Sequence, residues 1–259
     1  MVLDADGGGE TMACVDTTLA VELSTAIELR RATVPSPPFK GLMERASLDA
    51  DSIVRFRAND TIWRPEDVPD RILVIATGWA YRFHRLQEGS RQVLRFLIPG
   101  DVTPITTVVG DDEPLGFGVR AVTDLTAYSL EASRFRKLMF SSPKQRDALL
   151  HELCEQIRDL ENRVTDLGLR SSPSRVARLL LDIEARLSAR GLSVGHSFRF
   201  PVRQEDFARA LGLTPVHANR TLVQMRRKGC IEYRRGVMTL LDMPALERLA
   251  SEVTVTFAR

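Results

Sequence analysis

The pattern of hydrophobic and polar positions begins with a strand-rich stretch. Five segments between residues 39 and 137 are rich in β-branched and aromatic side chains and partly alternate. They are Ser52 to Phe56, Asp70 to Ile75, Gly78 to His84, Gln92 to Ile98 and Arg120 to Ser129. Clusters of turn residues such as Asn59-Asp60 and Pro99-Gly100-Asp101 separate them. This pattern predicts an antiparallel barrel or jelly roll, after which Arg134 to Phe140 begins a helix.

The segment from Pro143 to Leu169 predicts one long helix. Six of its apolar residues recur at steps of three and four: Leu150, Leu153, Ile157, Leu160, Val164 and Leu167. Such a narrow seam is typical of two helices that pair as a coiled coil, so we expect a homodimer. The alternative is a long helix that lies on its own barrel. Ser172-Pro173 then predicts the start of a new helix and a hinge to a C-terminal domain.

A helix-turn-helix pattern lies between Arg203 and Lys228. Gln204 to Leu211 has helical apolar spacing, and Gly212 is suited to the left-handed turn after a helix. Thr214 can cap a second helix, which has Pro215 in its first position and ends before Gly229. Two short helices around such a turn are typical of a unit that places its second helix in the DNA major groove.

The polar face of the second predicted helix carries groups that recognise DNA. Arg220 can bind guanine through two hydrogen bonds, Asn219 can pair with adenine, and His217 lies beside them. Two predicted strands, Cys230 to Arg234 and Val237 to Leu241, meet at Arg235-Gly236 and form a basic wing. The alternative is a pair of surface helices with solvated charges. The agreement of turn, caps, polar face and wing favours DNA binding.

Length and charge support a division into a body and a DNA-binding end. The 259 residues suffice for two domains. Residues 172–259 hold 15 Lys and Arg against 8 Asp and Glu, whereas residues 1–171 hold 21 against 26. We therefore expect an α+β protein with an extension (1–38), a β-roll (39–137), a dimerisation helix (138–171) and a winged helix-turn-helix domain (172–259). The extension is expected to be partly disordered, and Thr18 to Arg31 could form a short helix within it.

Composition excludes several other classes. Cys14, Cys154 and Cys230 are far apart and have no metal-ligand spacing, which argues against zinc, an iron–sulfur cluster and a disulfide scaffold. No apolar run reaches the length of a transmembrane helix, and the N-terminus is too acidic for a signal peptide. We expect a cytoplasmic protein that is not attached to a membrane.

The predicted order of roll, long helix and winged helix resembles the CRP/FNR superfamily of bacterial transcription regulators over about residues 40–250. The segment QEDFARALGLTPVHANRTLVQMRRKGCIE carries most of the resemblance, and GWAYRFHRLQEGSRQVLRFLIPGD resembles part of the sensor roll. The resemblance implies a homodimer on a pseudopalindromic site in double-stranded DNA, with RNA polymerase as a further partner. Its recognition helices would enter successive major grooves about 34 Å apart.

By position, Arg220 matches the arginine with which this family reads guanine. Arg203, Gln204 and Thr214 match phosphate-contacting positions, and Pro215, next to Thr214, is predicted to bind DNA with them. The wing residues Arg234 and Arg235 could also reach phosphate. Val216 stands where the family often has a glutamate. His217 and Asn219 are therefore expected to take a larger share of the base readout.

The predicted sensor departs from the family's cyclic-nucleotide receptors. Leu115 and Gly116 stand where those receptors have the Arg-Ser pair that holds the cyclic phosphate, and Leu160-Glu161 replaces the Thr-Ser pair that meets the adenine. Cyclic AMP is therefore not expected in the usual pocket. Haem is not expected either, because His84 and His151 are better explained as surface residues. No cofactor is predicted, and the effector stays open.

Three rival hypotheses remain. The same architecture could act without a ligand, controlled by its abundance or by redox chemistry, for example through oxidation of Cys230; a small buried thiol is the simpler explanation of that residue. An enzyme with a regulatory winged helix would need catalytic motifs that the sequence lacks. A winged helix used only for protein contacts would not need a basic, Asn- and Arg-bearing face.

Overall fold

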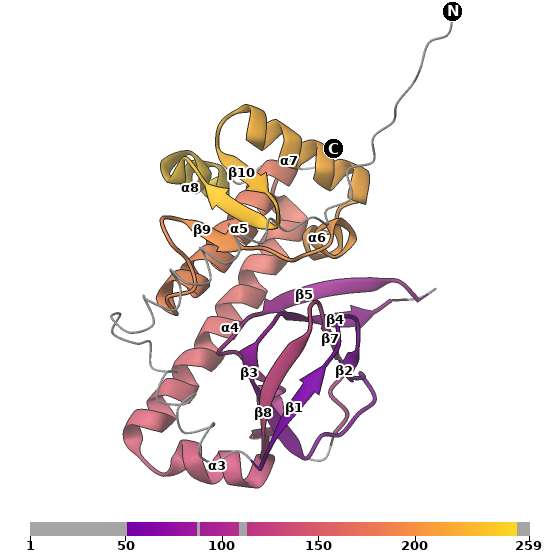
Figure 1. Cartoon of the computed structure of the whole chain (residues 1–259), viewed down its shortest axis with the longest axis vertical. Helices are drawn as coiled ribbons and strands as arrows, with labels where there is room; N and C mark the ends of the chain where they lie inside the picture. The colour runs from indigo at the N-terminus through magenta and orange to yellow at the C-terminus, as the bar shows by residue number, and fades with distance from the viewer. Residues whose placement is uncertain (1–50, 87–88, 109–112, 253–259) are drawn as a thin grey trace, which may run out of the picture.

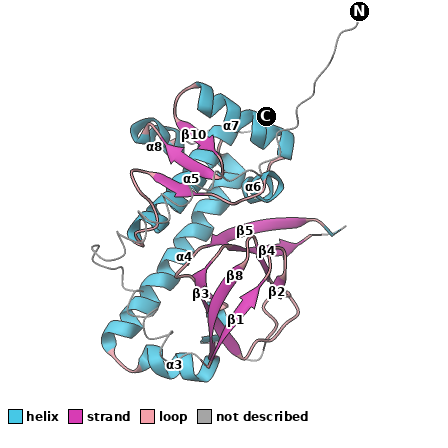
Figure 2. Ribbon diagram, viewed as in Figure 1, coloured by secondary structure: helices cyan, strands magenta, loops and turns pink. Residues whose placement is uncertain are grey.

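The structure, a computed structural model, describes residues 51–86, 89–108 and 113–252. A strand-rich roll occupies one end, and the long helix α4 (Pro143–Leu169) runs from the roll to a mainly helical module at the other end (Figure 1, Figure 2). The N-terminal extension, with Cys14 and the helix considered at Thr18 to Arg31, lies outside the described residues.

The roll is built from two four-stranded antiparallel sheets, with strand orders β1-β8-β3-β6 and β2-β7-β4-β5. The strands are β1 (Ser52–Phe56), β2 (Thr61–Trp63), β3 (Arg71–Thr77), β4 (Ala80–Arg85), β5 (Arg91–Leu97), β6 (Val102–Thr103), β7 (Gly118–Ala121) and β8 (Leu125–Glu131), with a 3-10 turn, η2, at Ile105–Val108. In β3, Leu73 and Ile75 join the core of the roll, whereas Ile72 and Val74 pack toward α3 (Ala132–Phe140) and α4. Because both faces of β3 are covered, its sequence is continuously apolar from Ile72 to Ala76.

The prediction of one strand from Arg120 to Ser129 is wrong. The chain turns between Val122 and Asp124, so that β7 pairs with β2 and β4 while β8 pairs with β1 and β3. The Thr123 hydroxyl accepts the N–H of Trp79 at 3.0 Å, and the Asp124 carboxylate accepts the N–H of Ala58 at 2.9 Å. The turn contains no Gly or Pro, so it lacks the strongest turn signals. The four other predicted strands are confirmed to within two residues.

Helix α4 confirms the predicted span from Pro143 to Leu169. The Ser142 side chain caps it by accepting the N–H of Gln145, and Pro143 follows directly. One side of the helix packs on the roll through Leu149, which is buried, and Leu153, which is partly buried. Leu153 thus differs from the rest of the predicted seam. The other five seam residues are 40–74% exposed in the single chain: Leu150, Ile157, Leu160, Val164 and Leu167.

The C-terminal module combines helices with a three-stranded sheet of order β10-β11-β9. Its elements are α5 (Ser172–Ala189), β9 (Ser197–Arg199), α6 (Gln204–Leu211), α7 (Pro215–Arg227), β10 (Ile231–Arg234), β11 (Val237–Leu240) and α8 (Met243–Ser251). The cap of α5 is Ser171, one residue before the expected Ser172. Strand β9 and helix α8 were not predicted from the sequence, although Asp242 caps α8 and Pro244 lies in its first turn.

The module and the roll share a hydrophobic core. Trp79, which precedes β4, meets Phe200 of the module edge-on, with ring centroids 6.0 Å apart. Arg163 of α4 bridges the two parts, because its guanidinium donates to Leu94 O of β5 at 3.0 Å and to Ala210 O of α6 at 2.7 Å. Helix α6 therefore lies directly against β5, as Figure 1 also shows.

Asp101 links the roll to α5. Its carboxylate is 3% exposed and accepts hydrogen bonds from Arg186 at 2.5 Å, from Arg190 at 2.7 Å and from the Ile98 N–H at 2.8 Å. Burial alone would raise the pKa of Asp101, but the charges of Arg186 and Arg190 hold it well below its usual range. The carboxylate is therefore a buried anion held between two parts of the chain.

None of the helices in the described ranges combines the length and the apolarity needed to cross a bilayer. Within the same ranges, no group of three or more His, Cys, Asp or Glu side chains is arranged to hold a metal ion.

Candidate nucleic-acid interface

The turn between α6 and α7 has the geometry that the sequence predicts. Gly212 ends α6 in the left-handed conformation, with φ 64° and ψ 36°, and the Leu213 N–H donates to Ala208 O at 3.0 Å. A Cβ atom at Gly212 would lie 2.6 Å from Leu167 Cδ2 at the end of α4. The glycine thus allows both the tight turn and the close approach of the long helix.

Helix α7 is fixed by its cap and by one buried stripe. The Thr214 hydroxyl accepts the His217 N–H at 3.3 Å, and Pro215 occupies the first turn. Ala218, Thr221 and Met225 are buried against the module. With 3.6 residues per turn, this stripe directs the opposite side of the helix outward.

The outward side of α7 carries most of the predicted base-contacting groups. The exposed side chains on this helix are Pro215, Val216, His217, Asn219, Arg220, Gln224, Arg226 and Arg227. His217 Nε2 also lies 3.2 Å from Ser172 Oγ at the start of α5. Gln224, which is exposed one turn beyond Arg220, was not among the predicted residues; its i, i+4 spacing from Arg220 could have identified it.

The start of α6 lies beside the start of α7. Arg203 and Gln204 are both exposed there, and Gln204 Nε2 donates to Pro215 O at 3.2 Å. This contact joins the N-terminal ends of the two helices. The structure thus brings four residues that were predicted to bind DNA to one edge of the module: Arg203, Gln204, Thr214 and Pro215.

The basic wing is a two-residue hairpin. Arg234 pairs with Val237 across β10 and β11, and the two turn residues, Arg235 and Gly236, have φ values of 52° and 78°. Positive φ at both positions is typical of the type I′ turn that suits a tight hairpin. Arg234 and Arg235 are exposed, and Arg234 Nε lies 3.3 Å from Glu232 Oε1. The turn holds two arginines at the tip of the wing.

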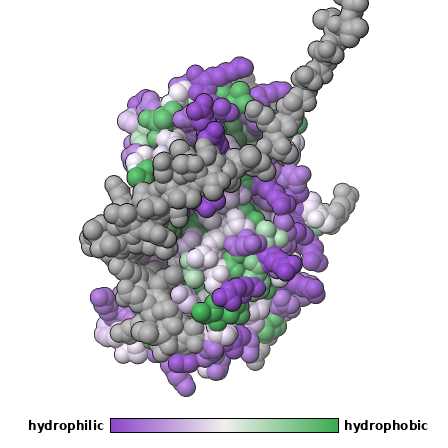
Figure 3. Space-filling model, viewed as in Figure 1, coloured by the Kyte–Doolittle hydropathy of each residue, from purple (hydrophilic) through white to green (hydrophobic). Residues whose placement is uncertain are grey.

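All nine predicted DNA-contacting residues are exposed on the C-terminal module. Residues 203–235 contain eight Lys and Arg against three Asp and Glu, so the whole segment is cationic. Figure 3 shows many hydrophilic side chains along the end of the molecule where α7 lies, with hydrophobic patches between them. A cationic surface with a projecting helix can attract phosphate and present hydrogen-bonding groups to base edges.

Leu115 of the roll stands where the family's cyclic-nucleotide receptors have the arginine that holds the cyclic phosphate, and it carries no charge. Leu115 packs against the core of the roll. The nearby Arg82 stacks 4.0 Å over the Phe117 ring and donates to Gln156 Oε1 of α4 at 3.1 Å. Burial lowers the pKa of Arg82 to about 10. This guanidinium stays charged at neutral pH and connects the roll to the long helix.

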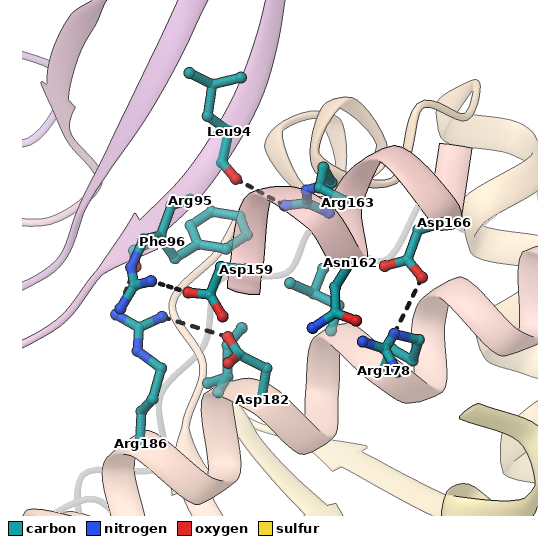
Figure 4. A pocket seen from close by; sticks show the side chains of 12 residues that line it. Leu94, Arg95, Phe96, Asp159, Asn162, Arg163, Asp166, Arg178, Asp182 and Arg186 are labelled. Atoms are coloured by element: carbon teal, nitrogen blue, oxygen red, sulfur yellow. Dashed lines mark hydrogen bonds and ion pairs between the residues drawn. The ribbon is translucent and has the colours of Figure 1, made fainter. Parts of the chain in front are cut away.

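A small charged hollow lies between β5, α4 and α5 (Figure 4). Its walls carry paired side chains: Arg95 with Asp159, Arg178 with Asp166, and Arg186 with Asp182. The cavity volume is about 80 Å³. Pockets for drug-sized ligands measure roughly 300–1,000 Å³, so this space suits a few water molecules rather than a nucleotide.

Two protein-family models match the chain. Residues 53–142 match a cyclic nucleotide-binding domain, and residues 174–249 match a Crp-like helix-turn-helix domain. The chain belongs to the CRP/FNR superfamily. The predicted fold class, with an antiparallel roll and a C-terminal winged helix-turn-helix, is confirmed.

Relatives of this CRP/FNR protein include named transcription regulators. It is 24% identical to the transcriptional activator protein FnrA of Stutzerimonas stutzeri, over 77% of this chain and 82% of that protein. It is 26% identical to the nitrogen fixation regulation protein FixK of Bradyrhizobium diazoefficiens, over 76% and 81% respectively. The structure of FixK2 from Bradyrhizobium japonicum matches with a TM-score of 0.68 and 21% identity, over 78% of this chain and 98% of that one. The protein is a DNA-binding transcription regulator and not an enzyme.

Proposed function

We propose that this CRP/FNR protein binds as a homodimer to a two-fold related DNA site and controls transcription from there. The observation that carries the proposal is the outward side of α7. It presents Asn219 and Arg220 beside His217, in a module whose surface is cationic. Phosphate contacts would position the module on the duplex, and these side chains would select the sequence.

Each exposed residue has a role that fits its place. Arg220 would bind guanine, Asn219 would bind adenine, and His217 would contact a neighbouring base or phosphate. The other predicted residues lie at the helix starts and at the wing tip, where phosphate is the expected partner: Arg203, Gln204, Thr214, Pro215, Arg234 and Arg235.

The exposed seam of α4 supports the homodimer. Five large apolar side chains along one side of this helix stay 40–74% exposed among the residues that the structure describes. A second copy of α4, packed on the same seam, would cover them as in a coiled coil. The two recognition helices would then be related by a two-fold axis, which a pseudopalindromic DNA site matches.

The roll is not proposed to bind cyclic AMP. Leu115 offers no charge for a phosphate, and Arg82 is already engaged with Phe117 and Gln156. No haem or iron–sulfur cluster is proposed. The protein would work in the cytoplasm with RNA polymerase, and its signal would be either a different effector or its own abundance.

The test is selection of bound sequences from random DNA by the purified full-length chain, followed by binding of the selected duplex and of a random duplex. We expect a motif with two-fold symmetry. The Arg220→Ala variant should lose about 1–3 kcal/mol of binding free energy per half-site on the selected duplex and little on random DNA.

The matched control is Arg55→Ala, which removes an exposed arginine from the roll. It should bind both duplexes as the parent chain does. Equal losses on both duplexes for Arg220→Ala would contradict the assignment of α7 as the recognition helix. Addition of cyclic AMP should leave both affinities unchanged, and a ligand-dependent increase would contradict the account of the roll.

A further inference from the structure

Val216 is an unusual residue on the outward side of the recognition helix. Its side chain is 70% exposed, the largest exposed fraction among the large apolar residues of the C-terminal module that the structure describes. It lies in the first turn of α7, directly after Pro215. The hydrophobic core of the module does not include it.

The helix geometry places Val216 at the centre of the face that projects from the module. The buried stripe consists of Ala218, Thr221 and Met225. Val216 precedes these residues by two, five and nine positions respectively. With 3.6 residues per turn, each of these steps leads to the opposite side of the helix. Val216 and Arg220 are four residues apart and therefore lie one turn apart on that side. A helix that brings Arg220 to a base edge also brings Val216 into the groove.

The chemistry of an isopropyl group restricts what it can recognise there. Val216 can neither donate nor accept a hydrogen bond, so it cannot distinguish bases by their polar edges. The major groove offers one apolar group, the C5-methyl group of thymine. A glutamate at the same place could accept a hydrogen bond from the cytosine amino group, whereas a valine leaves that group without a partner.

We infer that Val216 is a specificity-determining residue that contacts the C5-methyl group of one thymine in each half-site. The inference rests on the proposed role of α7 as the recognition helix. It adds an apolar contact to the hydrogen bonds of Asn219 and Arg220 and predicts a thymine at a fixed distance from the base that Arg220 reads.

The alternative explanation is that Val216 is exposed by chance and has no role in DNA binding, because single apolar residues are common on protein surfaces. The two explanations differ in what they predict for DNA. A chance surface residue would leave the base preference unchanged when it is replaced. A methyl-contacting residue would make binding depend on a single carbon atom of the DNA.

The experiment uses the full-length chain and its selected duplex, in which thymines are replaced one at a time by deoxyuridine. This change removes only the methyl group. For the parent chain we expect one position per half-site where the replacement weakens binding about four-fold, the factor that corresponds to about 0.8 kcal/mol for one buried methyl group. The Val216→Ala variant should bind the thymine and uracil duplexes equally at that position.

Two further variants sharpen the result. Val216→Glu should replace the thymine preference at this position by a preference for cytosine in a repeated selection. Val68→Ala is the matched control, because Val68 is an exposed valine of the roll. It should retain the four-fold difference between thymine and uracil.

The outcomes separate this inference from the proposed function. If Arg220→Ala loses sequence preference but no thymine position is sensitive to the methyl group, the inference is wrong and the proposed function stands. A thymine effect of equal size in the parent chain and in Val216→Ala would also overturn it. If no motif is selected and Arg220→Ala acts equally on all DNA, both fail together.

Discussion

Replacement of Asp101 by asparagine tests the contact between the roll and the DNA-binding module. The change keeps the shape of the side chain but removes the charge that Arg186 and Arg190 share. Both arginine side chains are less than 20% exposed, so their charges would be left without this partner in a poorly solvated place. Loss of one member of a buried ion pair costs about 3–5 kcal/mol of unfolding free energy.

Urea unfolding at fixed protein concentration measures this loss, because the concentration must be constant for a dimer. Trp79 provides the signal, since it is 6% exposed and packs on Phe200 across the contact. A Trp63→Phe background leaves Trp79 as the sole tryptophan of the chain. We expect Asp101→Asn to lower the unfolding midpoint and to shift Trp79 emission to the red at low urea.

The pH dependence of the parent chain follows from the low pKa of Asp101. The folded-state pKa lies below the unfolded value of about 3.9, so the stabilisation is complete above that value and is lost only as pH falls through the lower, folded pKa. Asp101→Asn should therefore differ from the parent chain by the same amount at pH 6 and pH 8.

The control is Asp182→Asn, because Asp182 also pairs with Arg186 but has a side chain that is 41% exposed. Solvent screening limits its expected cost to about 0–1 kcal/mol. If the two variants lose equal free energy, or if Asp101→Asn loses less than about 1 kcal/mol, the buried anion does not stabilise the contact as argued.

Three further outcomes are expected. The double variant Ile157→Asp with Val164→Asp should sediment as a monomer, whereas Leu86→Asp, an equally polar change at an exposed leucine of the roll, should not. Arg235→Ala should weaken binding to selected and random DNA alike. It should also reduce by about one the slope of the logarithm of the binding constant against the logarithm of the salt concentration, as measured by titration at several salt concentrations. A sequence-dependent loss would contradict a contact between Arg235 and phosphate. Cys154, which is exposed, should react with a thiol reagent in the folded protein, and Cys230, which is 5% exposed, should react only in urea, as mass spectrometry of each peptide can show.

The local signals of the C-terminal module could be predicted from sequence because the chemistry of each turn is specific. Gly212 ends α6 and Thr214 caps α7 as expected, and Arg235-Gly236 forms the hairpin turn. The turn at Val122 to Asp124 could not be found in this way, because its stability comes from contacts with Ala58 and Trp79, which are distant in sequence. Local patterns predict local structure best.

The contacts of the roll with α4 and α5 could not be predicted from the sequence either. The 3.5-residue spacing of α4 assigned Leu153 to the seam, but the structure partly covers it with the roll. Nothing in the sequence indicates that Asp101 meets Arg186 and Arg190, because it is more than 80 residues away from both arginines. The exposure of Val216 likewise became apparent only when the buried stripe of α7 was known.

The core shared by Trp79 and Phe200 has a practical consequence for anyone who divides this protein. A cut between α4 and α5 would leave aromatic side chains uncovered on both fragments, among them Tyr81 and Phe96 on the roll and Phe200 on the module. Each fragment would carry a newly exposed apolar surface, which promotes aggregation. The winged helix of this regulator thus cannot be exchanged as an independent unit, and chimaeras that replace it need the matching surface of β4 and β5 as well.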